Sequence, residues 1–399
     1  MPAPVEPTKS SSRPRARVLL AIKSLGHGGA ERLLVDMVAN GDHRAFDYEV
    51  AFVLDSESAF VPDLVANGTR VHGLGARHNL DLRWMLAFRR LLVADDFDIV
   101  HFHLPYTAAL GRLVVASLPR RRQPVTLYTE HSLWPKVAVL VKALNRATIG
   151  LDRALITVSQ AAHDALPRSL KPRARVVVHG VDLIPSRDMV LRRDQIRSAV
   201  RAELGIPSGA LLAMTVANLR SEKGYDVLLD AARLVADQGL PIRFAAAGQG
   251  SLADELTERH RALGLGERFQ FLGHRRDALA LLAAADIVVL PSHQEGLPVV
   301  LMEATSVGTA IVATSVGGVP HVITDGTNGL VVAPGAPEQL AAAISRVGTD
   351  AALRHRLGDR ALADSTAFDV SRACGEVEGI YRRLLEAEPS GRRSGGRAS

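Results

Sequence analysis

Cysteine is almost absent from this chain: only one of its 399 residues, Cys374, is a cysteine. A single cysteine excludes an intrachain disulfide and a cysteine-based metal site, so we expect a cytoplasmic protein. No run of about 18 apolar residues occurs either, and we therefore expect no membrane-spanning helix. The N-terminal tail is rich in Pro, Ser and Arg and has no apolar core segment, which speaks against a secretory signal.

Strong charge is also missing from the body of the chain. The net charge is +6, but residues 1–17 contribute +3 of it and residues 387–399 contribute +2. The remaining sequence is nearly neutral, has few aromatic residues and carries no zinc-finger or RNA-binding motif, which disfavours a nucleic-acid partner. Apolar residues make up 47% of the chain, which is ample for the cores of the two domains that its length predicts.

Short apolar runs alternate with helical patterns in two successive series. The runs of the first series lie at 16–25, 47–54, 69–74, 97–103, 124–131, 153–159 and 174–180, and those of the second lie at 211–217, 242–248, 269–273, 287–292, 310–315 and 330–333. Apolar strands that alternate with helices are typical of a parallel sheet that helices cover on both faces. We therefore predict an α/β fold with two doubly wound, Rossmann-like domains that face a central cleft, since such sheets bind ligands at the carboxyl ends of their strands.

The run EGLPVVLME contains two glutamates, Glu295 and Glu303, with seven residues between them. Pro298 favours the start of a helix, which puts Glu295 at the rim of the preceding loop and Glu303 on the second helical turn. The helix N-terminus offers unpaired N–H groups to a phosphate, and the carboxylates can accept hydrogen bonds from hydroxyl groups. Two glutamates at this spacing are more often surface residues of an amphipathic helix, but the flanking EGLP and the motifs that follow favour a sugar-nucleotide site.

Two further motifs offer groups to an anionic ligand. Gly28 and Gly29 end the first apolar run in LGHGGAER, where they let a ligand approach the backbone before a helix begins. A dinucleotide fingerprint would need a third glycine where Glu31 stands, so an anionic group across the cleft is the better interpretation. Arg220 and Lys223, in NLRSEKG, follow the first strand of the second series and can neutralise a diphosphate. Taken alone, this motif could equally be a solvated charged turn.

Histidines end two strands of the first series. His101 and His103 share one face of the run DIVHFH, and His131 ends the run YTEH. A single strand histidine is usually structural, which we expect of His101. His103 and His131, at carboxyl ends of strands, are candidates for contact with a sugar hydroxyl or a transition-state charge. Gly248 in AGQG and His274 in FLGHRRD follow strands of the second series, where a ligand contact and a structural turn are equally good interpretations.

The run Asp96-Phe97-Asp98 spells the D-x-D of metal-dependent sugar transferases. It precedes its strand and would therefore lie at the amino end, away from the cleft. We interpret it as a connection between a helix and a strand, and we expect neither a metal ion nor another cofactor.

These motifs, taken in order with HGVD at 179–182, resemble the signatures of the retaining glycosyltransferases of family 4, which have the GT-B fold. The resemblance covers nearly the whole chain between the tails. It implies transfer of a sugar from a nucleotide donor, without a metal and with retained anomeric configuration. The family often has Gly-Arg where this chain has Ala217-Asn218, so the arginine comes two positions later, at Arg220.

The resemblance also implies roles for individual residues. The donor-binding residues would be Gly28, Gly29, Asn218, Gly248, His274, Gly296, Leu297, Pro298 and Glu303. The catalytic residues would be His131, Glu295, Arg220 and Lys223, with His103 as an acceptor-binding candidate. Glu303 would hold the donor ribose. Because no obvious nucleophile stands beside the donor, although Glu295 could be proposed, we favour attack by the acceptor from the face that the diphosphate leaves.

These assignments divide the chain into a disordered tail at 1–16, an N-terminal acceptor-side domain at 17–185, a C-terminal nucleotide-sugar-binding domain at 186–368, a helix at 369–386 that returns to the N-terminal domain, and a disordered tail at 387–399. A sugar-phosphate synthase and a nucleotide-sugar epimerase are alternatives on the same architecture. A non-catalytic nucleotide-sugar-binding protein is an alternative from another class. The broken glycine fingerprint disfavours a nicotinamide oxidoreductase.

The partners expected are a nucleotide-sugar donor and a glycan, lipid-linked or small-molecule acceptor. The stretch 135–148 places Val137, Leu140, Val141 and Leu144 on one helical face, with basic residues elsewhere. Such a helix can lie in an anionic membrane interface, which would add peripheral contact at the inner membrane face. An ordinary core-facing helix is the alternative.

Overall fold

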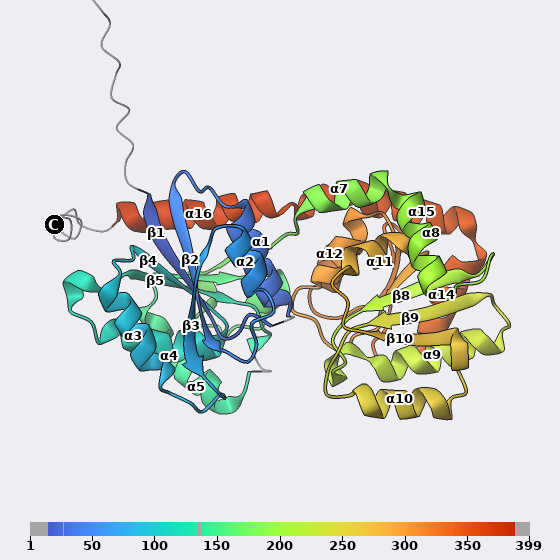
Figure 1. The fold of residues 1–399 in the computed structure, drawn as a ribbon, viewed down its shortest axis with the longest axis horizontal. Helices are drawn as coiled ribbons and strands as arrows, with labels where there is room; N and C mark the ends of the chain where they lie inside the picture. Colours follow the sequence, from blue (N-terminus) through green and yellow to red (C-terminus); the bar gives the residue numbers. More distant parts are fainter. Residues whose placement is uncertain (1–14, 27, 135–136, 388–399) are drawn as a thin grey trace, which may run out of the picture.

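The computed structural model describes residues 15–26, 28–134 and 137–387 of the chain. Most of the two tails predicted at 1–16 and 387–399 lies outside these residues, as do His27, Pro135 and Lys136. Figure 1 shows two lobes side by side, each built around a sheet with helices packed on it. The predicted fold of two Rossmann-like domains is confirmed.

Seven parallel strands form the sheet of the first domain, in the order β3-β2-β1-β4-β5-β6-β7. The strands are β1 (Ala16–Ile22), β2 (Phe46–Leu54), β3 (Arg70–Ala76), β4 (Ile99–His103), β5 (Val125–Glu130), β6 (Ala154–Thr157) and β7 (Ala174–Val176). The helices are α1 (Gly29–Asn40), α2 (Val61–Ala66), α3 (Trp84–Ala94), α4 (Pro105–Ala116), α5 (Val139–Thr148) and α6 (Gln160–Asp164). Neighbours along β1, such as Leu19 and Leu20, belong to different apolar clusters on the two faces of the sheet, which explains why its strands are apolar throughout.

Six parallel strands form the second sheet, in the order β10-β9-β8-β11-β12-β13. The strands are β8 (Leu211–Val216), β9 (Ile242–Ala247), β10 (Phe269–Gly273), β11 (Ile287–Leu290), β12 (Ala310–Thr314) and β13 (Leu330–Val332). The helices are α7 (Leu183–Leu191), α8 (Arg193–Glu203), α9 (Tyr225–Asp237), α10 (Ala253–Ala262), α11 (Ala278–Ala284), α12 (Val299–Ser306), α13 (Val319–Val322), α14 (Pro337–Thr349) and α15 (Ala351–Asp364).

The helix expected at 135–148 is α5, and the side chains that it buries completely are polar. Asn145 and Thr148 are buried on it, whereas Val139 and Leu140 are 79% and 70% exposed. Asn145 and Thr148 both accept hydrogen bonds from the buried Arg112 guanidinium. Val139 and Leu140, at the start of α5, therefore face outward, whereas Val141 and Leu144 are half-buried and lie one turn before Asn145 and Thr148 on the side that packs against α4.

The chain crosses between the domains twice, and the two crossings lie together. A Cβ built at Gly180 would lie 2.2 Å from the backbone oxygen of Phe368, and Val181 pairs with Asp369 in an isolated bridge. After the second crossing, α16 (Val370–Glu386) runs back along the first domain beside α1, as Figure 1 shows at the red end of the colour scale. Its Tyr381 is fully buried in the apolar cluster that contains residues of β1 and β2.

Candidate active site

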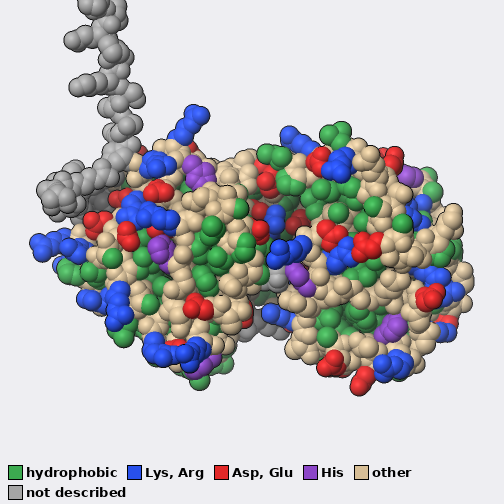
Figure 2. Space-filling model, viewed as in Figure 1, with side chains coloured by type: hydrophobic (Ala, Val, Ile, Leu, Met, Phe, Trp, Pro, Cys, Tyr) green, Lys and Arg blue, Asp and Glu red, His purple; other side chains and the backbone are tan. Residues whose placement is uncertain are grey.

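A cavity of about 490 Å³ lies between the two domains, and both contribute to its walls. The first domain supplies the N-terminal turn of α1 and part of α2, and the second supplies the loops after β8, β9 and β10 and the first turns of α12. Figure 2 shows acidic and basic side chains in the hollow between the two lobes. The loops of the second domain follow the carboxyl ends of parallel strands, which is the predicted ligand position for this fold.

Glu295 lies in the loop between β11 and α12 and is 6% exposed. Its Oε1 lies 2.7 Å from Nζ of Lys223 and accepts a hydrogen bond of 2.6 Å from Oγ of Ser292. Lys223 follows β8, which pairs with β11 in the sheet. The ion pair thus joins the loops after two neighbouring strands and fixes one carboxylate and one ammonium group at the cavity wall.

The N-terminal end of α12 forms another part of this wall. Leu297, Pro298 and Val299 line the cavity, and Pro298 is the residue that immediately precedes the helix. The first turn of a helix has unpaired N–H groups and the positive end of the helix dipole. The cavity therefore borders a structure that favours a phosphate group.

Two glycines in the second domain are required by close backbone contacts. A Cβ at Gly317, where φ is +50°, would lie 1.6 Å from the backbone oxygen of Glu295, and a Cβ at Gly248 would lie 1.9 Å from that of Ala217. Any side chain would therefore displace the loops that carry Glu295 and Asn218. Gly248, the first glycine of AGQG, therefore helps to shape the cavity wall.

Glu303 lines the cavity from the second turn of α12, as predicted from its spacing. Burial raises the pKa of its carboxyl group to about 7, Arg32 opposes this rise, and Asp36 adds to it. Arg32 and Asp36 belong to α1 of the first domain, and Nε of Arg32 lies 3.0 Å from Oδ1 of Asp36. A carboxylate of the second domain thus depends electrostatically on a cation of the first.

The histidines of the first domain form a buried row behind the cavity. His101 is bound on both ring nitrogens, by Tyr381 and Thr129, in keeping with the structural role expected of it. Nδ1 of His103 lies 2.9 Å from Nε2 of His131, and the two rings pack at 5.2 Å between centroids. Burial lowers the pKa of each of these three histidines, which keeps the rings neutral near pH 7.

This row supports the loop that carries Glu295. A Cβ at Gly296 would lie 2.7 Å from the backbone oxygen of His131, so the two backbones are in close contact. Ser159, which caps α6, donates a hydrogen bond of 3.1 Å to the Gly296 carbonyl. Both contacts cross from the first domain to the second.

The structure brings most of the predicted site residues to one cavity. Its walls include Gly28, Gly29, Asn218, Lys223, Gly248, His274, Glu295, Leu297, Pro298 and Glu303. The remaining predicted residues are outside its walls: Arg220 and Gly296 stand close in the chain to wall residues, the His131 backbone contacts Gly296, and His103 contacts His131. Arg220 is exposed and acts electrostatically on the Glu31 carboxyl. The roles of all these residues stay predictions.

Sequence analysis missed several charged residues of the cavity wall, namely Arg32, Asp63, Arg275 and Arg276. Arg32 stands one helical turn after Gly29 in GGAER, so the helical spacing could have indicated it. The two later arginines directly follow His274 in FLGHRRD. Asp63 lies in α2, which no motif identified.

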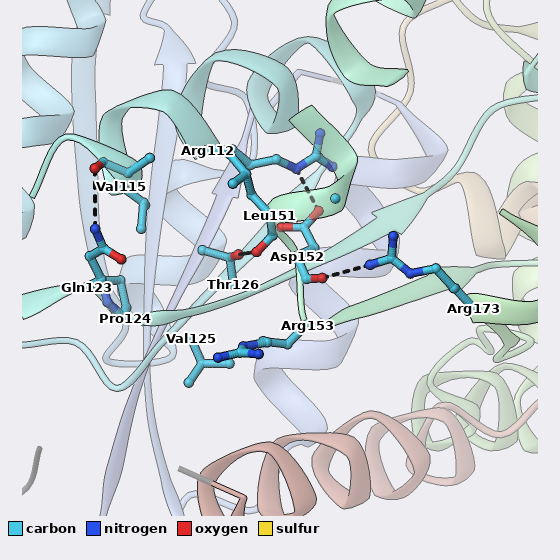
Figure 3. Close-up of a pocket in the computed structure, with 12 residues that line it drawn as sticks. Arg112, Val115, Gln123, Pro124, Val125, Thr126, Leu151, Asp152, Arg153 and Arg173 are labelled. Carbon is cyan, nitrogen blue, oxygen red and sulfur yellow. Dashed lines mark hydrogen bonds and ion pairs between the residues drawn. The ribbon is translucent and has the colours of Figure 1, made fainter. Parts of the chain in front are cut away.

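A second hollow, of about 450 Å³, lies at the other end of the first sheet, near the amino ends of β5 and β6 (Figure 3). Nε of the buried Arg112 lies 2.6 Å from Oδ2 of Asp152, and Arg173 donates a hydrogen bond to the Asp152 carbonyl. In Figure 3 the Arg153 side chain extends away from that of Arg173, so the two do not converge on one point. These groups hold the elements together, and we do not assign a ligand to this hollow.

Within the described ranges, no group of three or more His, Cys, Asp or Glu side chains is arranged to hold a metal ion. In the same part of the chain, no helix is both long enough and apolar enough to cross a membrane. Asp98, from the D-x-D run, accepts a hydrogen bond of 2.8 Å from the Arg17 backbone N–H at the amino end of β4.

Two family models match the chain, one on each domain. Residues 27–184 match the model described as "Glycosyltransferase Family 4", and residues 196–364 match the model described as "Glycosyl transferases group 1". Together they cover every residue that lines the cavity, although β1 precedes the first matched range.

Curated relatives and solved structures agree with these matches. The chain is 31% identical to D-inositol 3-phosphate glycosyltransferase of Corynebacterium aurimucosum, over 73% of this chain and 73% of that protein. It is 27% identical to alpha-D-kanosaminyltransferase of Streptomyces kanamyceticus, over 78% of this chain and 84% of that protein. Anabaena Alr3699/HepE, crystallised with UDP and glucose, superposes with a TM-score of 0.79 at 21% identity, over 92% of this chain and 100% of that one.

Proposed function

Since the chain belongs to the glycosyltransferases of family 4, we propose that it transfers a sugar from a nucleoside diphosphate to an acceptor hydroxyl, with retained anomeric configuration and without a metal ion. One observation carries this proposal. The cavity between the domains has the Lys223–Glu295 pair, the α12 N-terminus and Glu303 in its walls. These groups supply the positive charge for a diphosphate and the carboxylates for hydroxyl groups.

In the proposed reaction, the acceptor oxygen forms a bond to the anomeric carbon while the bond from that carbon to the diphosphate breaks. The electron pair of the broken bond stays on the diphosphate, which also takes the acceptor's proton. Attack occurs from the face that the diphosphate leaves, so the configuration is retained. Lys223, Arg220 and the α12 N-terminus stabilise the charge on the diphosphate, and the contribution of the protein is mainly orientation and electrostatics.

Glu295 is better suited to electrostatic support than to nucleophilic attack. Its Oε1 is already shared between the Lys223 ammonium and the Ser292 hydroxyl, which lowers its nucleophilicity and holds the carboxylate in one orientation. We propose that it faces the sugar of the donor, with His131 on the opposite side of the loop. Glu303, four residues into α12, would accept hydrogen bonds from the ribose hydroxyls.

The relatives suggest which substrates to try first. Alr3699/HepE binds UDP and glucose, and the two curated relatives carry names that specify inositol phosphate and an aminosugar transfer. We propose a UDP-sugar as the donor and a polyhydroxylated acceptor. A cytoplasmic enzyme fits a nucleotide-sugar donor and the single cysteine.

The exposed end of α5 supports a lipid-linked acceptor as a second candidate. Val139 and Leu140 project into solvent, with Lys142 and Arg146 on the same helix. Such a helix can insert apolar side chains into an interface while its cations meet anionic headgroups. In that case the acceptor would enter the cleft from the membrane surface.

A thermal-shift screen with UDP, GDP and ADP sugars tests the donor and the absence of a metal together. The expected result is stabilisation by one nucleoside diphosphate, undiminished by EDTA. Binding that is lost with EDTA and restored by magnesium or manganese would overturn metal-independent binding. Binding without transfer to any acceptor and without donor hydrolysis would favour a binding protein, and a free sugar phosphate as acceptor would favour the synthase alternative.

A further inference from the structure

One face of α1 is packed against α12 across the cleft. Gly29, Arg32, Leu33 and Asp36 recur at the spacing of a single helical face. A Cβ at Gly29 would lie 3.6 Å from Cγ2 of Val299. Leu33 is 2% exposed and belongs to the apolar cluster of the second domain, although α1 belongs to the first. The position of this face is therefore set by contacts with the second domain.

Arg32 is the cation of this face, and two carboxylates, Asp36 and Glu303, act on it electrostatically. Asp36 pairs with it from one helical turn away, and Glu303 lines the same cavity from the second domain. Burial raises the pKa of Glu303, and Arg32 is the group that opposes this rise. Neighbouring elements add further charged groups around the cavity: Asp63 of α2, Lys223 after β8, and Arg275 and Arg276 after β10. Asp182, before α7, acts electrostatically on Asp36.

We propose that Arg32 is a positioning residue for the donor site, which reaches from the first domain to keep Glu303 of the second domain ionised. The inference rests on the proposed function, in which Glu303 binds the donor ribose. An ionised carboxylate accepts hydrogen bonds on both oxygens, whereas a protonated one must present a donor to one of its partners. Because the two residues belong to different domains, donor affinity depends on a charge that is supplied only while α1 is packed on α12.

The test compares UDP affinity by calorimetry at pH 7 and pH 9 in the full-length protein and its variants. Arg32→Gln removes the charge, and Arg32→Lys restores it. Arg233→Gln is the control for loss of a helical arginine, because Arg233 of α9 also forms an i,i+4 pair and is 43% exposed, against 41% for Arg32, although its partner Asp237 is more exposed than Asp36. Taking the ratio of variant to parent at the same pH removes the titration of UDP itself.

Arg32→Gln should bind UDP about fivefold more weakly at pH 7 and within about twofold of the parent at pH 9. Loss of the Arg32 charge is expected to lower the acid dissociation constant of Glu303 about tenfold. The ionised fraction of Glu303 would then fall from about one half to about one tenth at pH 7, whereas Glu303 would stay mostly ionised at pH 9. Arg32→Lys and Arg233→Gln should match the parent at both pH values. In a Glu303→Gln background, Arg32→Gln should have no further effect.

An equal loss of affinity at pH 7 and pH 9 would mean that Arg32 contacts UDP directly or only supports the fold, and would overturn the proposal. Unchanged affinity at pH 7 would also overturn it. Failure of the donor site itself is recognised separately, because the parent would then not bind any nucleoside diphosphate or Glu303→Gln would bind as tightly as the parent.

Discussion

Buried charged side chains have different roles in the two domains. Among the described residues between 186 and 368, Glu295 is the one fully buried carboxylate or cation, Glu303 is half-buried, and both line the cavity. The first domain buries several, and most are paired away from the cleft: Asp36, Glu49, Asp81, Arg112, Glu130 and Asp152. In the second domain the buried Glu295 therefore lies at the cavity, although the nearly buried Asp286 side chain pairs with Arg197 and Arg201 away from it, whereas most buried charges of the first domain hold secondary-structure elements together.

Replacing Arg112 with methionine tests whether the buried charges of the first domain stabilise its fold. Asp152 would lose its partner at 2.6 Å while it stays buried, and removal of one member of a buried pair costs about 3–5 kcal/mol. We expect the free energy of unfolding, measured in urea, to fall by that amount, with UDP affinity unchanged under conditions where the variant is folded. Normal stability with lost UDP binding would show that Arg112 serves the site.

A matched surface control is available for this variant. Arg259 of α10 pairs with Asp230 at 2.7 Å, but both side chains are exposed to solvent. Arg259→Gln should change stability by no more than about 1 kcal/mol, because exposed ion pairs contribute little. A similar loss from both variants would indicate that burial does not distinguish the two pairs.

Glu295→Gln tests the functional side of the comparison and should act on turnover. The carboxylate at the cavity wall would become neutral and the Lys223 ammonium would lose its partner. We expect kcat to fall about 10²–10³-fold, the scale seen when one group of a preorganised electrostatic site is removed. UDP affinity should change less than kcat. The control is Glu258→Gln on the exposed side of α10, and unchanged kcat in Glu295→Gln would contradict its catalytic assignment.

The same contrast explains what the sequence could predict. All thirteen predicted strands are found, because parallel strands buried on both faces are continuous apolar runs. The positions of the residues proposed to bind the donor could also be predicted, since EGLPVVLME, NLRSEKG and AGQG place polar groups in short loops after strands or in the first turns of helices. Local spacing was sufficient to position Glu295, Lys223 and Glu303 at one cavity.

The contacts of the first domain were harder to predict from the sequence, because its polar residues interact with residues far away in the chain. Arg112 contacts Asn145 and Asp152, which come from a helix and a loop some 30–40 residues later in the chain. Asn145 and Thr148 lie one turn after the half-buried Val141 and Leu144, so helical periodicity indicated the inward face of α5 but not the polar contacts that it makes. Helical spacing could have placed Arg32 at the cavity, but its electrostatic interaction with Glu303 depends on how the two domains pack, which no local motif encodes.

Glu303→Gln should have an effect of intermediate size with a defined pH dependence. The pKa of Glu303 is raised from 4.5 to about 7 in the folded protein, so folding takes up a proton between these values. The stability contributed by the protonated carboxyl is present below about pH 4.5 and is lost as the pH rises toward 7. We expect the glutamine variant to be more stable than the ligand-free parent by about 1–3 kcal/mol at pH 8, with little difference at pH 4.5.

The same variant should bind UDP more weakly by about 1–3 kcal/mol at pH 8, because it loses hydrogen bonds made by a charged acceptor. Thermal unfolding with and without UDP measures both effects in one series. Greater stability of the variant together with full UDP affinity would show that the ionised Glu303 carboxylate destabilises the fold without contributing to donor binding. A difference in stability between the variant and the parent that is the same at pH 4.5 and pH 8 would contradict the raised pKa of Glu303.

The smallest expected effect concerns α5, where the first domain exposes the apolar side chains of Val139 and Leu140 to solvent. If α5 lies in a membrane interface, Arg146 contributes about 1 kcal/mol to binding of anionic lipid, so Arg146→Gln should reduce partition into anionic liposomes about fivefold. Arg360→Gln on α15, another exposed helical arginine, is the control and should leave partition unchanged. Leu140→Ser should also reduce partition, but without the dependence on salt that marks the arginine. If the parent does not bind anionic liposomes at low salt, the exposed leucine and valine do not serve a bilayer, and the acceptor is better sought among water-soluble polyols.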